Sequence, residues 1–359
     1  MNIAFLIPSM LSGGAERAIS ILCNEFSKMG NQVSLLLTED AKHIYYKLDE
    51  NVRVIDIVDN RMPYYIRIPN YIRNIKKHLA EKKIDVLVSF IVRTNVLAII
   101  SCKSSGIPVI VSERNNPYLV PASYSWRKIR DFSYKFADGI VFQTGHAQHY
   151  FCSSIRKSST IIMNPITDDI IGDSTSDNRD NIIIMACRLE DQKNVRMLIN
   201  AFSLIYKDIP NYKVLVYGEG SQRTMLQNLI DKLGLHDVIL LKGRSEQIIR
   251  EISKAKIFAL TSRYEGLSNA VMEAMCVGTP CVVTDSPTFG NRDLIDNGIN
   301  GFIVPLENEE EMAKKILLLA KDDNLRESFS VQAKKLYKKV NSKYIAKKWY
   351  DYINEVIKK

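Results

Sequence analysis

Residues 257–284 read IFALTSRYEGLSNAVMEAMCVGTPCVVT. An apolar run at 257–261 precedes a polar loop, an apolar helical segment at 269–277 and a second apolar run at 281–284. This order predicts strand, helix and strand, the repeating unit of a parallel sheet covered by helices. Ligands of such sheets bind beyond the carboxyl ends of the strands, so the loop at 262–268 is the first candidate for a functional site.

The same rhythm continues on both sides of this stretch. In the second half of the chain it predicts strands at 182–186, 213–217 and 238–242, and helices at 195–206, 221–233 and 245–255. In the first half it predicts strands at 2–8, 32–37, 86–90, 109–112 and 139–143, and helices at 15–28 and 95–104. We therefore expect an α/β protein of two Rossmann-like, doubly wound domains, which suits a length of 359 residues.

The domain boundaries follow from polarity. Residues 167–181 are polar and lack periodicity, which predicts an interdomain linker. We assign residues 1–167 to an N-terminal Rossmann-like domain and residues 168–342 to a C-terminal one. Apolar side chains at helical spacing in residues 343–359 predict a final helix that crosses back to pack on the first domain.

The composition is that of a folded soluble protein, with 46% hydrophobic and 25% charged residues. Six cysteines without a CxxC pair favour reduced core residues in a cytosolic protein over a metal or redox site. The apolar start at 3–8 is better explained as a first strand than as part of a signal peptide. Arg93 and Asn95 interrupt the apolar stretch 86–102, so we expect no transmembrane helix.

Positive charge concentrates in one segment of a chain whose net charge is +9. Residues 61–83 hold seven basic residues against one acidic residue, together with several isoleucine and tyrosine side chains. This pattern suits peripheral association with an anionic membrane surface, and it equally suits a solvated helix face. A pI near 9.1 suggests nucleic-acid binding, but the segment adjoins no nucleic-acid motif, so we expect no nucleic-acid partner.

Two loops of the second domain carry candidate ligand-binding charges. Arg188 and Lys193 follow the strand at 182–186, and such a pair can clamp a diphosphate, although two solvated surface charges would look the same in sequence. Glu265 and Glu273 stand eight residues apart, about 12 Å along a helix, which exceeds the roughly 5–9.5 Å between the carboxylates of a glycosidase pair. We therefore expect these two acids to serve different parts of one long ligand.

Backbone groups add further candidates. Free N–H groups that open the helix after Glu265 can bind phosphate or sugar oxygens. These groups belong to Gly266, Leu267, Ser268 and Asn269. Two glycine-containing loops, one with Gly13 and Gly14 and one with Glu219, are weaker signs because such turns are common.

One resemblance unites these motifs. EGLSNAVMEAMCVGTPCV at 265–282 resembles the signature of the retaining glycosyltransferases of family four, with the two acids as its E-x7-E pair. Similar family motifs are GGAER at 13–17, CRLEDQKN at 187–194, YGEG at 217–220 and DNGINGFIV at 296–304. The resemblance implies a GT-B architecture, a nucleotide-sugar donor bound in a cleft between the domains, retention at the anomeric carbon, and neither metal nor cofactor.

The resemblance also implies roles for individual residues. Arg188 and Lys193 would hold the donor diphosphate and stabilise its charge as it departs. Glu273 would bind the ribose hydroxyls, and Glu265 would orient the sugar together with backbone at 266–269. The remaining donor contacts would come from Glu219 and, from the facing domain, Gly13 and Gly14.

The chain also departs from the family pattern. Some relatives have a histidine after the strand equivalent to 109–112, but this chain reads SERNNP at 112–117, so no imidazole base can be assigned there. Glu113 and Arg114 are our candidates for the acceptor side. The loop at 286–293 lacks the double glycine of many relatives.

These observations predict a transferase of bacterial glycan assembly. It would move a hexose or N-acetylhexosamine, for example N-acetylgalactosamine (GalNAc), from a UDP-sugar to a polyprenyl-diphosphate-linked saccharide at the inner face of the cell membrane. An epimerase or phosphorylase of the same architecture is the enzymatic alternative, and a basic nucleic-acid-binding protein is the alternative outside enzymes.

Overall fold

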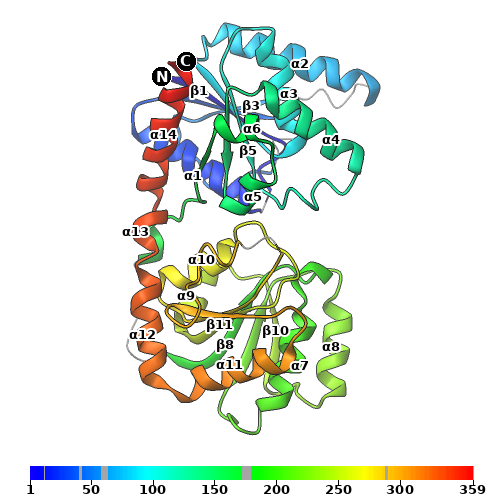
Figure 1. Ribbon diagram of the computed structural model, residues 1–359, viewed down its shortest axis with the longest axis vertical. Helices are drawn as coiled ribbons and strands as arrows, with labels where there is room; N and C mark the ends of the chain where they lie inside the picture. Colours follow the sequence, from blue (N-terminus) through cyan, green and yellow to red (C-terminus); the bar gives the residue numbers. More distant parts are fainter. Residues whose placement is uncertain (12, 40–42, 58–63, 172–178, 288–289, 359) are drawn as a thin grey trace. The chain divides into compact units, whose positions relative to one another are not determined.

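The computed structural model describes residues 1–11, 13–39, 43–57, 64–171, 179–287 and 290–358, and the chain forms two compact units (Figure 1). Unit 1 comprises Met1–Pro165 and Val340–Lys359, and unit 2 comprises Ile166–Lys339. The chain passes from one unit to the other twice, close to the boundaries expected at 167/168 and 342/343.

Unit 1 is built on a parallel sheet with the strand order β3-β2-β1-β4-β5-β6-β7. Its strands are β1 (Asn2–Ile7), β2 (Gln32–Leu37), β3 (Arg53–Asp56), β4 (Val86–Phe90), β5 (Val109–Glu113), β6 (Gly139–Phe142) and β7 (Ser159–Ile161). Its helices are α1 (Gly14–Lys28), α2 (Tyr64–Glu81), α3 (Val92–Lys103), α4 (Tyr124–Ser133), η1 (Tyr134–Phe136), α5 (Gly145–His149), α6 (Ser153–Lys157) and α14 (Ser342–Ile357). The central strands β4 and β5 are buried along their whole length and are mostly apolar, because helices cover both faces of this sheet.

The last helix, α14, belongs to unit 1. Trp349 is fully buried in the core that α1 and α14 form on one face of the sheet, and its ring stacks on Phe90 with centroids 5.7 Å apart. Tyr352 accepts a hydrogen bond from the amide of Ile140 at 2.9 Å and donates one to the carbonyl of Ser158 at 2.7 Å. The final helix therefore completes the hydrophobic core of the first sheet.

Unit 2 contains a second parallel sheet with the order β10-β9-β8-β11-β12-β13. Its strands are β8 (Asp180–Ala186), β9 (Lys213–Tyr217), β10 (Ile239–Gly243), β11 (Ala255–Leu260), β12 (Cys281–Thr284) and β13 (Gly301–Val304). Its helices are η2 (Asp168–Ile171), η3 (Asp191–Lys193), α7 (Val195–Ile205), α8 (Arg223–Lys232), α9 (Ile248–Lys254), α10 (Asn269–Cys276), α11 (Glu309–Lys321) and α12 (Asp323–Lys334), and α13 (Tyr337–Val340) spans the second crossing. The two Rossmann-like sheets expected from the sequence are confirmed.

The expected linker at 167–181 needs correction at both ends. Residues 168–171 form η2 within unit 2, where Asp168 accepts a hydrogen bond from the Tyr337 hydroxyl at 2.6 Å. Strand β8 already begins at Asp180. The intervening part of the expected linker, 172–178, lies outside the described residues. The polar composition of 167–181 thus predicted a longer linker than the structure has, because both ends of this segment belong to secondary structure of unit 2.

Most of the basic segment at 61–83 forms α2, and its apolar side chains have a structural role. Ile75 and Leu79 are buried in the core on the second face of the first sheet, while Arg73 and Lys77 are exposed. Arg61 lies outside the described residues. Core packing therefore accounts for much of the amphipathic pattern. Within the described ranges, no helix combines the length and apolarity needed to cross a bilayer.

The cysteines are all free thiols, as expected, but they are not all in the core. Cys152 is exposed at the start of α6, and Cys187 lies at the end of β8 with intermediate exposure. The buried thiols are those of Cys23, Cys102, Cys276 and Cys281.

Candidate functional site

Two glycines bring neighbouring strand-end loops of unit 2 into backbone contact. Gly218 follows β9 with φ +135°, and a Cβ at this position would overlap the carbonyl of Cys187. A Cβ on Gly220 would overlap the carbonyl of Leu189. Leu189 donates its N–H to the carbonyl of Glu219 at 2.9 Å. The glycines after β9 therefore permit a close fit against the loop after β8.

This fit fixes the backbone that carries Arg188 and leaves its side chain free. Glu190 accepts hydrogen bonds from Ser221, one from the amide at 3.1 Å and one from the hydroxyl at 2.7 Å. Arg188 itself is exposed, and it has no hydrogen bond or ion pair with any residue that the structure describes. Glu219 is also exposed and pairs with Arg223 at 3.1 Å.

Lys193 and Glu265 form a close ion pair. The Lys193 Nζ lies 2.5 Å from Glu265 Oε1, and the two side chains are 15% and 9% exposed. The chain separates these residues by 72 positions, and the adjacent parallel strands β8 and β11 bring them together. Because the carboxylate offsets the charge of Lys193, an anionic ligand here meets one free cation, Arg188, and one shared cation.

Burial raises the pKa of the nearby Cys187 thiol to about 12. The thiol is therefore neutral at ordinary pH and adds no negative charge beside the two cations.

The loop that carries Lys193 is hydrogen-bonded to the residue that follows β11. Thr261 donates its hydroxyl towards the carbonyls of Lys193 and Asn194, at 3.1 and 2.9 Å. Gln192 donates its side-chain amide to the carbonyl of Tyr264 at 2.9 Å. These contacts connect the QKN part of the first loop to the residues that precede Glu265.

Arg263 is a further side-chain connection between the same two loops. It pairs with the Asp191 carboxylate, donates to the Asp191 carbonyl at 3.1 Å, and donates through Nε to Glu307 at 2.8 Å. Glu307 also accepts from the side chain of Asn194, which has a left-handed backbone with φ +46°. Sequence reasoning missed Arg263 and Glu307, because Glu307 lies 44 and 113 positions away from its two partners.

The loop after Glu265 leads directly into α10. Ser268 is the N-cap residue, and the Met272 amide donates to its carbonyl at 3.1 Å, so the N–H groups ahead of Met272 precede the first bond of the helix. Leu267 and Ser268 are buried, whereas Gly266 and Asn269 are partly exposed. Glu273 is buried on α10.

The loop after β12 contacts the loop that leads into α10. A Cβ on Gly290 would overlap the carbonyl of Gly266, so these two backbones are in contact. Asn291 donates its side-chain amide to the carbonyl of Thr284 at 2.9 Å and fixes the loop to its strand. Residues 288–289, which belong to the loop where a double glycine is lacking, lie outside the described residues.

In unit 1, Gly13 and Gly14 open α1, but a carboxylate of the chain already occupies this helix end. Gly13 is the N-cap residue, and a Cβ on it would overlap the carboxylate of Glu16. Burial raises the pKa of Glu16. An anionic ligand at this N-terminus would therefore need to displace Glu16.

Glu113 and Arg114, expected on the acceptor side, are both buried. The Glu113 side chain has no exposed surface, faces Arg130 at 3.8 Å, and accepts a hydrogen bond from the Tyr134 hydroxyl at 3.2 Å. Burial raises its pKa. Glu113 thus belongs to the interior of unit 1, which argues against direct contact with an acceptor.

Arg114 lies at the carboxyl end of β5 in a largely apolar setting. Its Nη1 donates to Asn164 at 2.7 Å, and its guanidinium carbon lies 4.0 Å from the centroid of the Phe90 ring. Its Nε and Nη2 are buried without a hydrogen-bond partner among the described residues. Burial lowers the pKa of Arg114 to about 9. Two unsatisfied donors make this side chain costly to bury.

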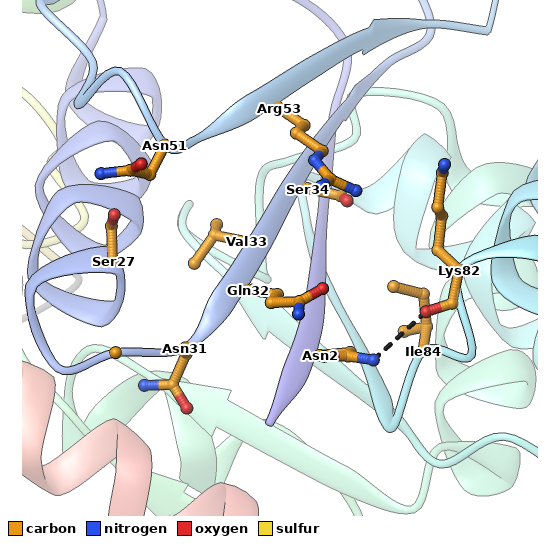
Figure 2. A pocket seen from close by; sticks show the side chains of 11 residues that line it. Asn2, Ser27, Asn31, Gln32, Val33, Ser34, Asn51, Arg53, Lys82 and Ile84 are labelled. Carbon is orange, nitrogen blue, oxygen red and sulfur yellow. Dashed lines mark hydrogen bonds between the residues drawn. The ribbon is translucent and has the colours of Figure 1, made fainter.

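A polar hollow of about 400 Å³ lies at the opposite edge of the first sheet (Figure 2). Its lining includes Asn2, Ser34, Arg53 and Lys82, at or next to the amino ends of β1, β2, β3 and β4, and Asn2 donates to the carbonyl of Lys82 at 3.3 Å. None of the candidate site residues lines it. Within the described ranges, no group of three or more His, Cys, Asp or Glu side chains is placed to hold a metal ion.

Comparison with known families matches both halves of the chain. Residues 12–169 match the family described as Glycosyltransferase Family 4, and residues 167–336 match Glycosyl transferases group 1.

Two relatives from Campylobacter jejuni are similar over nearly their whole lengths. The "GalNAc-alpha-(1->4)-GalNAc-alpha-(1->3)-diNAcBac-PP-undecaprenol alpha-1,4-N-acetyl-D-galactosaminyltransferase" is 31% identical, with 99% of each chain covered. The "N-acetylgalactosamine-N,N'-diacetylbacillosaminyl-diphospho-undecaprenol 4-alpha-N-acetylgalactosaminyltransferase" is 25% identical, with 98% of this chain and 99% of the relative covered.

Solved structures share the fold at low sequence identity. HepE of Anabaena in complex with UDP has a TM-score of 0.80 at 17% identity, covering 99% of this chain and 100% of HepE. A glycosyltransferase from Rickettsia africae has a TM-score of 0.84 at 16% identity, covering 99% of this chain and 98% of the other.

Proposed function

The chain belongs to the family 4 glycosyltransferases, and from this premise we propose that it transfers GalNAc or a related hexose from a UDP-sugar to a polyprenyl-diphosphate-linked saccharide. The sugar and the acceptor are those named for the relative that is 31% identical over 99% of both chains. The relatives of this chain are named as glycosyltransferases, which does not favour the epimerase, the phosphorylase or the nucleic-acid-binding alternative.

One observation carries the donor side of this proposal. The loops after β8 and β11 bring Arg188, Lys193 and Glu265 to the same edge of the second sheet, next to the start of α10. Free cations and the amino end of a helix are the groups that bind a nucleoside diphosphate. The exposed Arg188 supplies planar donors, while Lys193 supplies a point charge that the diphosphate would share with Glu265.

The same groups give the proposed chemistry a route without a metal. The bond between the anomeric carbon and the diphosphate oxygen breaks, and the electron pair goes to that oxygen. Arg188 and Lys193 then stabilise the added charge, an effect that is typically worth about 2.7–4 kcal/mol for one well-placed donor. The acceptor hydroxyl attacks from the same face, so configuration is retained, and its proton passes to the departing phosphate oxygen.

Glu265 has two tasks in this scheme. Its carboxylate fixes Lys193 in the absence of donor, and it accepts hydrogen bonds from sugar hydroxyls once the diphosphate has taken over part of the lysine charge. Glu273, buried on α10, would bind the ribose. The lipid-linked acceptor would hold the enzyme at the inner face of the cell membrane, as a peripheral protein.

The donor assignment is tested by thermal unfolding with UDP-, GDP- and ADP-sugars, each without acceptor. A donor at 100 times its dissociation constant adds about 2.7 kcal/mol to stability, so only UDP-sugars should raise the midpoint. Stabilisation by a GDP- or ADP-sugar alone would contradict the assignment.

Transfer is then tested with the stabilising donor and a polyprenyl-diphosphate-linked saccharide, with and without a chelator. We expect an extended lipid-linked product whose new bond is α-configured by NMR, formed at the same rate with chelator present. Loss of turnover on chelation would remove the metal-independent mechanism. Conversion of the UDP-sugar without acceptor would instead indicate an epimerase.

A further inference from the structure

Helix α4 presents its apolar side chains to solvent. Four large side chains of α4 and the adjoining η1 are exposed, Tyr124 by 66%, Ile129 by 43%, Phe132 by 62% and Phe136 by 45%. Their spacing along the chain places them on one outward stripe, and the fully buried side chain of α4 is Arg130. This is the reverse of the usual pattern, in which a helix buries its apolar stripe and exposes its charges.

The buried arginine anchors α4 to the preceding loop through backbone carbonyls. Arg130 donates to the carbonyl of Val120 at 2.7 Å and to that of Pro117 at 3.0 Å. It also pairs with Asp131 at 2.9 Å. A well-bonded guanidinium thus anchors the buried side of the helix, while the apolar stripe on the other side is exposed, with the Phe132 and Phe136 rings in edge-to-face contact at 5.2 Å between centroids.

Positive charges flank the stripe. Lys128 and Lys135 are exposed, and the Lys128 Nζ lies 5.3 Å from the centroid of the Tyr124 ring. Both lysines and Phe132 also line a hollow of about 490 Å³. The one acid of α4, Asp131, is bound by Arg130 and by the Tyr150 hydroxyl at 3.1 Å, so it does not oppose these charges. We call Tyr124, Lys128, Ile129, Phe132, Lys135 and Phe136 together the α4 face.

Contiguous exposed aromatic and aliphatic side chains mark an interaction surface. Lysine is depleted from the cores of protein–protein interfaces, yet here two lysines stand among the apolar groups. Aromatic side chains next to lysine are instead typical of a surface that lies in the headgroup region of an anionic bilayer.

The α2 surface has the charges but few of the apolar groups. Arg73 and Lys77 are exposed there, while Ile75 and Leu79 are buried, and among its described side chains Ile68 is the large apolar one that is exposed. Helix α3 contacts both α2 and α4 within unit 1 (Figure 1). The cations of α2 can therefore add long-range attraction, but they lack a stripe that can insert.

We propose that the α4 face docks this enzyme on an anionic membrane, with Phe132 and Phe136 inserted among the headgroups and Lys128 and Lys135 bound to lipid phosphates. The proposal rests on the proposed function in one respect, since a lipid-linked acceptor is what makes docking useful. The binding itself does not depend on the sugar that is transferred, because the exposed side chains of the α4 face would carry most of it.

The test is flotation of the full-length protein with phosphatidylglycerol-containing vesicles and with phosphatidylcholine vesicles. Wild type should bind the anionic vesicles, and Phe132→Ser with Phe136→Ser should weaken binding about tenfold or more, since each ring loses its burial in the headgroup region. Lys128→Gln and Lys135→Gln should each cost about fivefold, and 1 M salt should weaken wild-type binding.

Matched controls separate this surface from others. Leu204→Ser with Val331→Ser removes exposed apolar side chains from unit 2 and should leave flotation unchanged. Arg73→Gln with Lys77→Gln removes two positive charges from α2, as many as the two lysine substitutions on the α4 face together. This variant should weaken vesicle binding less than the phenylalanine pair does. If the phenylalanine variant floats like wild type, or if the α2 variant alone loses binding, the proposal is wrong.

Activity on a short, water-soluble acceptor distinguishes this failure from failure of the proposed function. The phenylalanine variant should keep its unfolding midpoint and its rate with the soluble acceptor, and lose rate only with acceptor embedded in vesicles. A protein that binds vesicles through the α4 face but transfers no sugar would refute the proposed function and leave the docking surface intact.

Discussion

Replacing Gly218 by alanine tests whether the donor loops depend on backbone contact. Gly218 has φ +135°, and a Cβ there would overlap the Cys187 carbonyl. A side chain in such a backbone conformation costs about 1–3 kcal/mol, and the overlap adds about 1–3 kcal/mol. We expect a total near 4 kcal/mol, which lowers the unfolding midpoint of a unit of this size by about 8–16 °C.

Gly234→Ala is the matched control. Gly234 also lies in unit 2 with a positive φ of +69°, but nothing lies within 4 Å of an added Cβ. This variant should lose about 1 kcal/mol, or about 2–4 °C, from backbone strain alone. The difference between the two variants measures the contact with the loop that carries Arg188.

Thermal unfolding with and without the stabilising UDP-sugar is the assay. Gly218→Ala should lose most of the donor-induced shift because the Arg188 loop is displaced, whereas Gly234→Ala should keep it. Equal midpoints for the two variants, together with equal donor shifts, would refute the reasoning that glycine at 218 is required for the site.

The other predictions concern charges at the site and in the core. Arg188→Ala and Lys193→Ala should each lower kcat/KM about 10²–10³-fold, and a loss below tenfold in both would exclude them from stabilising the leaving group. Arg188→Ala should keep the unfolding midpoint because its side chain is exposed, whereas Lys193→Ala should lower it because the Glu265 carboxylate loses its partner. Arg263→Gln should raise the donor KM about 5–20-fold with little change in kcat, because it loosens the loop that carries Lys193; since its ion pairs are partly exposed, it should cost only about 1 kcal/mol in stability. Burial lowers the pKa of His78 below its ordinary 6.5, so the unfolded chain takes up the proton more readily and stability is lost as pH falls below that value. His78→Leu should therefore flatten the decline in urea stability between about pH 7.5 and about pH 5.5, and an unchanged slope would show that another group titrates.

Much of the fold was predictable because the spacing of apolar residues, and the polar loops that separate apolar runs, are local properties of a sequence. The apolar runs that became β4, β9 and β12 coincide with the expected strands, since residues buried on both faces of a parallel sheet must be apolar regardless of their partners. Elements that this reasoning missed, such as α4, lack that pattern, because α4 is anchored by Arg130 and not by an apolar stripe.

The candidate site divides in the same way. Arg188, Lys193 and Glu265 could be selected from the sequence, because parallel strands bring their carboxyl ends to one edge whatever the loops contain. Whether these side chains are paired or free could not be predicted from the sequence. The ion pair of Lys193 with Glu265 depends on the conformations of two loops whose residues are 72 positions apart.

The sequence by itself determined the two parallel sheets, the strand-end loops and the residue types available for binding a diphosphate. Only the tertiary structure decided that Glu113 lies inside unit 1, that Arg263 joins two loops through Glu307, and that α4 turns its aromatic side chains outward. The physical reason is that burial and ion pairing are set between segments distant in the chain, and no local pattern carries the identity of the partner.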